Sequence, residues 1–284
     1  MARLFSRLLL VAAFVALANL AGRRAPVAQA ATTLQTIVVT GGQPDDITTD
    51  AQGRLVWGDI ARGTVERLDG GRIVTLARGL SVPEGVVALP NGDIAVAEQG
   101  RDRILRLDGR GRLTVLYTLR PVPGQEGVDG IGRDPRTGEL LIPDSPHGTV
   151  LGLSPDGRHV RLIAQGLGRP VDAKLDRRGD ILVPDEHLGT LAVIAPDGKI
   201  TYRGNLSIPD DVAIDRTGHI WITTLGDGGL WVIDPAGAPR RVLVGLANPQ
   251  GLTLDRCGDP IIVEQNSARI VRLLLTPSSA RCPL

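Results

Sequence analysis

The sequence predicts an all-β protein, a six-bladed β-propeller, and three observations lead to that prediction. A motif of roughly 40 residues recurs six times, which is typical of a four-stranded propeller blade. Glycine (36) and proline (20) are abundant and spread along the whole 284-residue chain, which favours many tight turns. The apolar runs between these turns are too short for helices and fit strands.

The six repeats are recognised by their first residues, which begin 39 to 45 positions apart. They are Pro44-Asp45-Asp46-Ile47, Pro83-Glu84-Gly85-Val86, Val128-Asp129-Gly130-Ile131, Pro170-Val171-Asp172-Ala173, Pro209-Asp210-Asp211-Val212 and Pro249-Gln250-Gly251-Leu252. Each continues through a strand, a turn such as Asp215-Arg216-Thr217-Gly218, and further strands. The last repeat has no fourth strand, and residues 34–39 (LQTIVV) can supply it. We therefore expect an N-terminal strand to close the ring and remove an exposed sheet edge.

Residues 1–30 are predicted to be a signal peptide, and residues 31–284 the propeller. Arg3 and Arg7 provide the positive start, residues 8–20 the apolar stretch, and Ala28-Gln29-Ala30 the cleavage pattern. The alternative is an uncleaved anchor stopped by Arg23-Arg24, although the apolar run is shorter than the roughly 20 residues of a membrane span. Cleavage predicts a periplasmic or secreted protein with no membrane attachment.

Export also affects the interpretation of the two cysteines. In an oxidising compartment, Cys257 and Cys282 are candidates for a disulfide that fastens the C-terminal tail to the last blade. Two free thiols are the alternative. The formal net charge of +1 argues against a nucleic-acid partner held by bulk charge.

Propeller geometry places the second residue of each repeat around one mouth of the central channel. Four of these six positions carry carboxylates, at Asp45, Glu84, Asp129 and Asp210, and Asp172 lies one residue beyond the position held by Val171. Converging carboxylates repel one another, so they indicate a bound cation, raised pKa values or side chains turned outward. A hard, oxygen-liganded ion such as Ca²⁺ is the natural candidate. Turn formation by Asp is the alternative for any single position.

Two histidines lie in matching loops on the same predicted face. His147 and His187 are candidates for a general base or a substrate-orienting donor, because imidazole titrates near neutral pH. The alternative is that both are exposed loop residues.

Loop acids recur in five of the six repeats, which favours a role in holding the scaffold over a role in catalysis. These acids are Asp59, Glu98, Asp144, Asp185 and Glu264.

Two repeats resemble the gluconolactonase/regucalcin (senescence marker protein) family of six-bladed propellers. The matching residues are Arg54 to Ile60 with Val65 to Asp69 in the first repeat, and Pro209 to Asp215 with His219 to Ile222 and Gly228-Gly229 in the fifth. The other repeats are similar to generic NHL-type repeats. The resemblance covers about residues 44–255.

This resemblance implies one divalent ion, often Ca²⁺, at the channel mouth, and hydrolysis of lactones and related esters. The family's ligand positions fall on Asp45, Asp129, Val171 and Asp210, and Val171 cannot bind a metal. Asp172 can substitute by a small loop shift, and Glu84 can add a ligand from another blade. Asp210 or a nearby histidine would then activate water.

Three functions follow as hypotheses. The first is a metal-dependent hydrolase acting on a small-molecule lactone or ester. The second is a non-catalytic NHL-type propeller that binds a ligand or a protein partner in the periplasm, since a fold alone does not choose a function. The third is a lyase of the streptogramin-cleaving type, against which the count of six repeats argues, because those propellers have seven blades.

Overall fold

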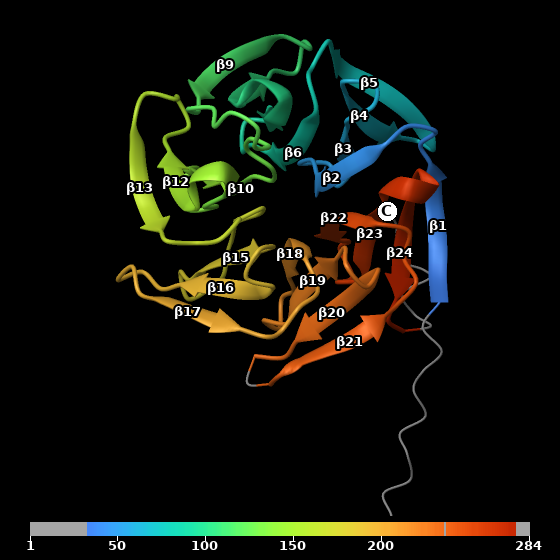
Figure 1. Ribbon diagram of the computed structural model, residues 1–284. Helices are drawn as coiled ribbons and strands as arrows, with labels where there is room; N and C mark the ends of the chain where they lie inside the picture. The colour runs from blue at the N-terminus through green and yellow to red at the C-terminus, as the bar shows by residue number, and fades with distance from the viewer. Residues whose placement is uncertain (1–32, 236, 277–284) are drawn as a thin grey trace, which may run out of the picture. The chain divides into compact units, whose positions relative to one another are not determined.

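The computed structural model describes residues 33–235 and 237–276, and these form six four-stranded antiparallel sheets arranged in a ring (Figure 1). The predicted six-bladed propeller is therefore confirmed. The predicted signal peptide (residues 1–30) and Cys282 lie outside the described residues, so cleavage and the disulfide with Cys257 stay predictions. No helix in the described part of the chain is long and apolar enough to span a membrane.

Each repeat of the sequence forms one blade, with its first strand on the channel and its last strand outermost. Blades 1 to 3 are β2 (Pro44–Thr49), β3 (Leu55–Asp59), β4 (Thr64–Asp69) and β5 (Arg72–Arg78); β6 (Pro83–Ala88), β7 (Ile94–Glu98), β8 (Arg103–Leu107) and β9 (Leu113–Thr118); and β10 (Gly132–Arg133), β11 (Leu140–Asp144), β12 (Thr149–Leu153) and β13 (Val160–Gln165).

Blades 4 to 6 repeat this order. They are β14 (Lys174–Leu175), β15 (Ile181–Asp185), β16 (Thr190–Ile194) and β17 (Ile200–Arg203); β18 (Pro209–Ile214), β19 (Ile220–Thr224), β20 (Gly229–Ile233) and β21 (Pro239–Leu243); and β22 (Pro249–Leu254), β23 (Pro260–Glu264), β24 (Arg269–Leu274) and β1 (Thr33–Val39). Three short 3₁₀ helices follow second strands: η1 (Gln99–Arg101), η2 (Ser145–His147) and η3 (Gln265–Ser267).

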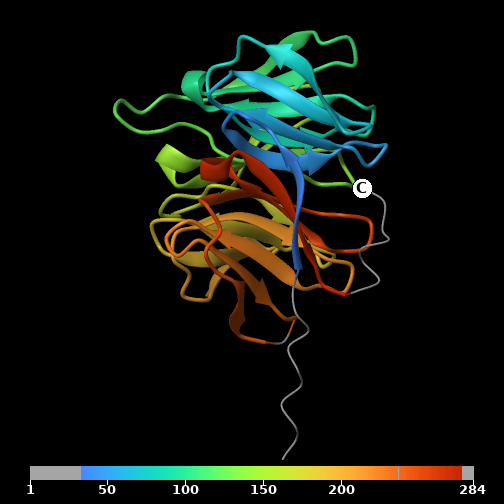
Figure 2. The ribbon, with the colours of Figure 1, turned by 90° about the vertical axis from the view of Figure 1, so that its right-hand side faces the viewer.

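The ring is closed as the sequence predicts, by a strand from the N-terminal end. β1 pairs antiparallel with β24, from Thr33 opposite Leu274 to Val39 opposite Arg269. Figures 1 and 2 both show β1 lying along β24 at the outer edge of the last blade. Blade 6 thus contains residues from both ends of the described chain. Because β1 pairs with β24, β24 is not left as an exposed sheet edge.

The hydrophobic core is divided into six clusters, each packed between two successive blades. In the cluster between blades 6 and 1, Trp57 and Val263 are fully buried, and Ile37 and Val38 of β1 pack against it. Because apolar burial acts between blades as well as within them, it stabilises the ring and fixes the inner strands that carry the polar residues of the channel.

Candidate metal and ligand site

The second residues of the six repeats, which we call the ring positions, lie in the first residues of the inner strands or in the loops before them. They surround one mouth of the channel. Asp45, Glu84 and Asp210 are the second residues of β2, β6 and β18, while Asp129 precedes the short strand β10. We call these four residues the acidic mouth. The neighbouring ring position holds Val171, which is buried.

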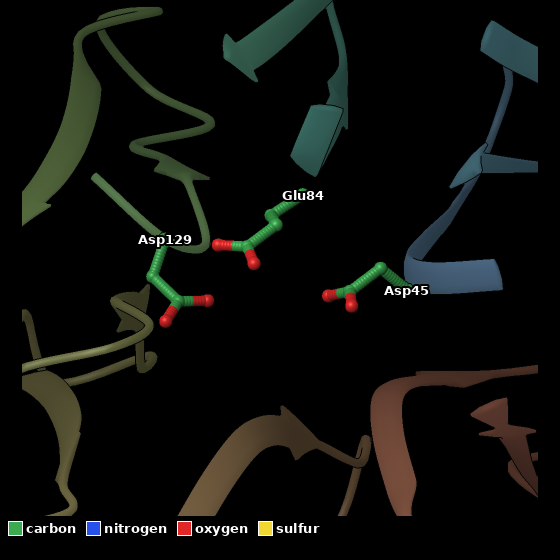
Figure 3. A group of neighbouring side chains, drawn as sticks. All are labelled: Asp45, Glu84 and Asp129. Carbon is green, nitrogen blue, oxygen red and sulfur yellow. The ribbon is translucent and has the colours of Figure 1, made fainter. Parts of the chain in front are cut away.

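Three members of the acidic mouth converge closely. Asp45, Glu84 and Asp129 each offer a carboxylate oxygen, and these oxygens all lie within 4.8 Å of one another. Figure 3 shows the three side chains pointing toward a common space from three different blades. Asp45 is buried, and the other two are partly exposed. Oxygen ligands from carboxylates are the donors that Ca²⁺ and Mg²⁺ prefer.

The fourth carboxylate of the acidic mouth, Asp210, is held by an amide. With its amide nitrogen facing the carboxylate, Gln250 donates hydrogen bonds to Asp210 Oδ2 at 2.9 Å and Oδ1 at 3.2 Å. The Gln250 oxygen then accepts one from Asn248 Nδ2 at 3.0 Å. This arrangement fixes the orientation of the Asp210 carboxylate at the mouth.

Donors from neighbouring loops hold the other three carboxylates. Gln265 Nε2 donates to Asp45 Oδ2 at 2.6 Å, and Gln99 donates to Glu84. The guanidinium of Arg169 lies 3.2 Å from Asp129 Oδ2. Each carboxylate of the acidic mouth therefore has a preset orientation before any ligand binds.

Arg169 also joins two further acids. It is 2.8 Å from Glu126 Oε2 and forms an ion pair with Glu186. One cation thus faces three acidic side chains at the blade whose ring position, Val171, supplies no carboxylate. Its positive charge compensates only part of the negative charge at this mouth.

Burial and mutual repulsion raise the pKa values of the acidic mouth. Desolvation, followed by repulsion from Asp129, raises the pKa of Asp45 to about 8. Desolvation raises the pKa of Asp129 to about 7, against the opposing effect of Arg169. Desolvation and repulsion also hold the pKa values of Glu84 and Asp210 well above their ordinary range. Without a cation, the mouth therefore retains protons, and a cation would displace them.

Asp172 lies outside the acidic mouth and belongs to a deeper set of buried side chains. Asp46, Asp172, Asp211 and Lys174 form what we call the aspartate–lysine layer. Lys174 Nζ is 2.6 Å from Asp172 Oδ1 and 3.6 Å from Asp211 Oδ1. Because Asp172 follows the ring position by one residue, its carboxylate is engaged by this lysine, and the structure does not bring it to Asp45, Glu84 and Asp129.

The aspartates of this layer link neighbouring blades. Asp46 Oδ2 accepts a hydrogen bond from the backbone N–H of Val86 at 2.9 Å, Asp172 Oδ2 from Val212 at 3.2 Å, and Asp211 Oδ2 from Leu252 at 2.5 Å. Blades 3 and 4 are instead linked by the backbone, since Gly130 N donates to Val171 O at 2.7 Å. Gly130 permits this approach, because a Cβ there would lie 2.7 Å from Val171 O.

The two candidate histidines follow β11 and β15, the second strands of blades 3 and 4. His147 Nδ1 is 2.8 Å from Asp144 Oδ1, and His187 is exposed beside Glu186. In the part of the chain that the structure describes, neither imidazole hydrogen-bonds to any of the four carboxylates.

The predicted scaffold role of the loop acids is confirmed at four of the five. Each accepts a hydrogen bond from a backbone N–H in the loop that leads to the inner strand of its own blade. The pairs are Asp59 with Gln43, Glu98 with Ser81, Asp185 with Gly168 and Arg169, and Glu264 with Ala247. Asp144 contacts His147 instead.

Sequence reasoning missed the residues that surround the carboxylates. Gln99, Glu186 and Gln265 all stand one position after a loop acid, and each contacts the acidic mouth or Arg169. That position varies from blade to blade, while the position before it is an acid in five of the six blades. The variation was the available signal, because a site on a repeat protein must depart from the repeat.

Comparison with known proteins supports the fold. No protein-family model matches the chain, and no curated protein matches it. Among solved structures, a gluconolactonase from Xanthomonas campestris is similar at 19% identity and a TM-score of 0.72, over 86% of this chain and 90% of that one. A putative glucose dehydrogenase from Thermus thermophilus is similar at 16% identity and a TM-score of 0.71, over 86% and 100%.

Virginiamycin B lyase from Staphylococcus aureus is also similar, at 17% identity and a TM-score of 0.64, over 81% of this chain and 80% of that one. At these identities the likeness shows a shared fold. The chain thus has the architecture of gluconolactonase-like six-bladed propellers.

Proposed function

We propose that the protein is an exported, metal-dependent hydrolase that opens a lactone or a related ester at the acidic mouth. The observation that carries this proposal is the convergence of Asp45, Glu84 and Asp129 oxygens within 4.8 Å of one another. Export rests on the sequence of residues 1–30. The likeness to a gluconolactonase adds a precedent for this fold, but residues of the mouth carry the argument.

The donor set fits a hard divalent cation such as Ca²⁺. All candidate ligands are carboxylate oxygens, they come from separate blades, and hydrogen bonds to Gln99 and Gln265 orient two of them. Asp45, Glu84 and Asp129 would hold the ion, with Asp210 beside them. When bound, such an ion polarises a substrate carbonyl and stabilises negative charge on its oxygen.

In this proposal Asp210 would act as the general base. Its ionised carboxylate would take a proton from the attacking water as the new bond between oxygen and the carbonyl carbon forms. The bond between that carbon and the ring oxygen then breaks, and the proton passes to the leaving oxygen to give a hydroxy acid. Gln250 fixes the carboxylate for this exchange. A raised pKa suits the role, because a base works best near the operating pH.

The test is hydrolysis of a panel of lactones and aryl esters by the purified protein, with EDTA and after Ca²⁺ is restored. We expect activity only with the ion present. Asp210→Asn should lower kcat by about 100-fold or more while Ca²⁺ still binds, whereas Asp45→Asn should weaken Ca²⁺ binding. Asp156→Asn, in an exposed turn, is the matched control and should change neither. Ca²⁺ binding without hydrolysis of any substrate would contradict the proposal.

The second candidate function is a non-catalytic binding propeller, and one observation favours it. Arg169 already pairs with Asp129 and supplies a fixed positive charge at the mouth. A ligand with hydrogen-bond donors could then bind the remaining carboxylates without any metal. Chelation separates the two functions, because a metal-free binding site keeps its ligand affinity in EDTA.

A further inference from the structure

The central channel contains a cavity on the far side of the aspartate–lysine layer from the acidic mouth. It has a volume of about 360 Å³ and is lined by inner-strand residues of all six blades. We call it the inner-strand cavity. Each blade contributes to this lining, in order from blade 1 to blade 6 through Ile47, Val86, Arg133, Leu175, Val212 and Leu252. These residues come two to four positions after the ring positions, so the cavity lies further along the channel.

Arg133 is one of two cationic residues that line this cavity. Its Nε is buried and has no hydrogen-bond partner, and among residues 33–235 and 237–276 no ion pair or hydrogen bond engages its side chain. An arginine remains protonated, so this side chain places a positive charge in the wall of the cavity.

Other sheltered arginines of the protein are paired with acids. Arg272 pairs with Asp259 at 3.2 Å and with Asp255, and Arg169 pairs with three carboxylates. The acid next to Arg133 in the chain, Asp134, accepts hydrogen bonds from Arg136. Arg133 thus differs from these arginines in forming no ion pair within residues 33–235 and 237–276, and its nearest charge is that of Asp134.

The second cation of the cavity needs no further anion. Lys174 also lines the wall, but its Nζ is engaged by Asp172 and Asp211 and donates to Ile131 O at 3.4 Å. The remaining wall is largely aliphatic. A guanidinium without an ion pair beside an apolar wall is complementary to a carboxylate that carries an apolar body.

We propose that the inner-strand cavity is a second ligand site, which binds a small aliphatic carboxylate through Arg133. The carboxylate accepts hydrogen bonds from the guanidinium, and the alkyl group is buried against the aliphatic residues of the inner strands. The volume is at the lower end of the roughly 300–1,000 Å³ typical of ligand sites, which fits a single short acid. The aspartate–lysine layer separates this site from the acidic mouth, so neither needs the other to be occupied.

Isothermal titration with octanoate tests the proposal. We expect wild-type protein to bind octanoate, and to bind acetate and 1-octanol at least tenfold more weakly, because each lacks one of the two recognised parts. Arg133→Met should weaken octanoate binding at least tenfold, and Arg133→Lys less, because lysine keeps the charge. Each variant is checked for an unchanged circular dichroism spectrum.

Arg136→Met is the matched control, since it removes one positive charge three residues away, in the turn after β10, and Arg136 does not line the cavity. It should bind octanoate as the wild type does, and Asp45→Asn should do so too, which keeps this test independent of the metal site. No octanoate binding by the wild type, equal binding by Arg133→Met, or an equal loss in Arg136→Met would each overturn the proposal.

Discussion

The two ends of the channel are built from the same inner strands and have opposite chemistry. At the acidic mouth, four of six equivalent positions carry carboxylates, whose repulsion is one cause of their raised pKa values. Four residues further along each strand, the equivalent positions are Thr49, Ala88, Arg133, Leu175, Ile214 and Leu254, of which only Arg133 is charged. A sixfold repeat thus provides the frame, and single departures from it determine what each end can bind.

The largest expected effect concerns the layer that separates the two ends. Lys174→Met should destabilise the protein by about 3–5 kcal/mol, because it leaves the buried Asp172 and Asp211 carboxylates without their cation. Urea denaturation measures the change. The double variant Lys174→Met/Asp172→Asn should recover much of the loss, and a loss under about 1 kcal/mol for the single variant would show that the layer does not depend on this ion pair.

The second prediction concerns the pH dependence of stability, which arises from the carboxylates of the acidic mouth. In EDTA, the melting temperature should fall as pH rises from about 4 to 8. The folded-state pKa values of Asp45 (about 8) and Asp129 (about 7) lie above the ordinary 3.8, so the folded state binds more protons in this window and loses stability as they dissociate.

Ca²⁺ should restore the melting temperature that is lost at high pH, because the ion takes the place of the protons at the acidic mouth. At 100 times its Kd an ion that binds only the folded state adds about 2.7 kcal/mol. For a chain of this size that corresponds to roughly 5–10 °C. Differential scanning fluorimetry at pH 5 and pH 8 measures both effects, with Arg133→Met as the control that keeps the response. A flat pH profile in EDTA would contradict the account.

The third prediction tests the links between blades. Asp46→Ala should cost about 1–3 kcal/mol, because the buried N–H of Val86 loses its acceptor. Asp46→Asn keeps an acceptor oxygen and should cost less. Urea unfolding of the two variants gives the comparison, and equal losses would indicate that the charge of Asp46 matters more than its hydrogen bond.

The smallest effect is expected at the acidic mouth itself. Arg169→Gln should tighten Ca²⁺ binding about fivefold, equivalent to roughly 1 kcal/mol for a partly exposed ion pair. The reason is that Asp129 loses a competing cation. Isothermal titration measures the affinity, and weaker Ca²⁺ binding would show that Arg169 positions Asp129 for the ion.

Much of the fold was predictable from the sequence, because each repeat encodes one blade locally. The spacing of the turns identified six blades, and the missing fourth strand of the last repeat predicted the pairing of β1 with β24. The constant loop acids such as Glu98 and Glu264 were correctly assigned to the scaffold, since a residue shared by nearly all blades serves the frame.

The site was predictable only in part. The ring positions of Asp45, Glu84 and Asp129 followed from the repeat, but the direction of a side chain one residue later did not. Asp172 illustrates this, because the contact with Lys174 depends on how blades 4 and 5 pack. The link from Gln265 in the last blade to Asp45 in the first joins residues 220 positions apart and depends on ring closure.

The most direct test of the central claim is anomalous X-ray scattering from crystals soaked in Mn²⁺ or Ca²⁺. The account predicts one strong peak among the oxygens of Asp45, Glu84 and Asp129, at the roughly 2.0–2.6 Å typical of hard cations. No peak at that position, with the three carboxylates held together only by shared protons or by Arg169, would contradict it.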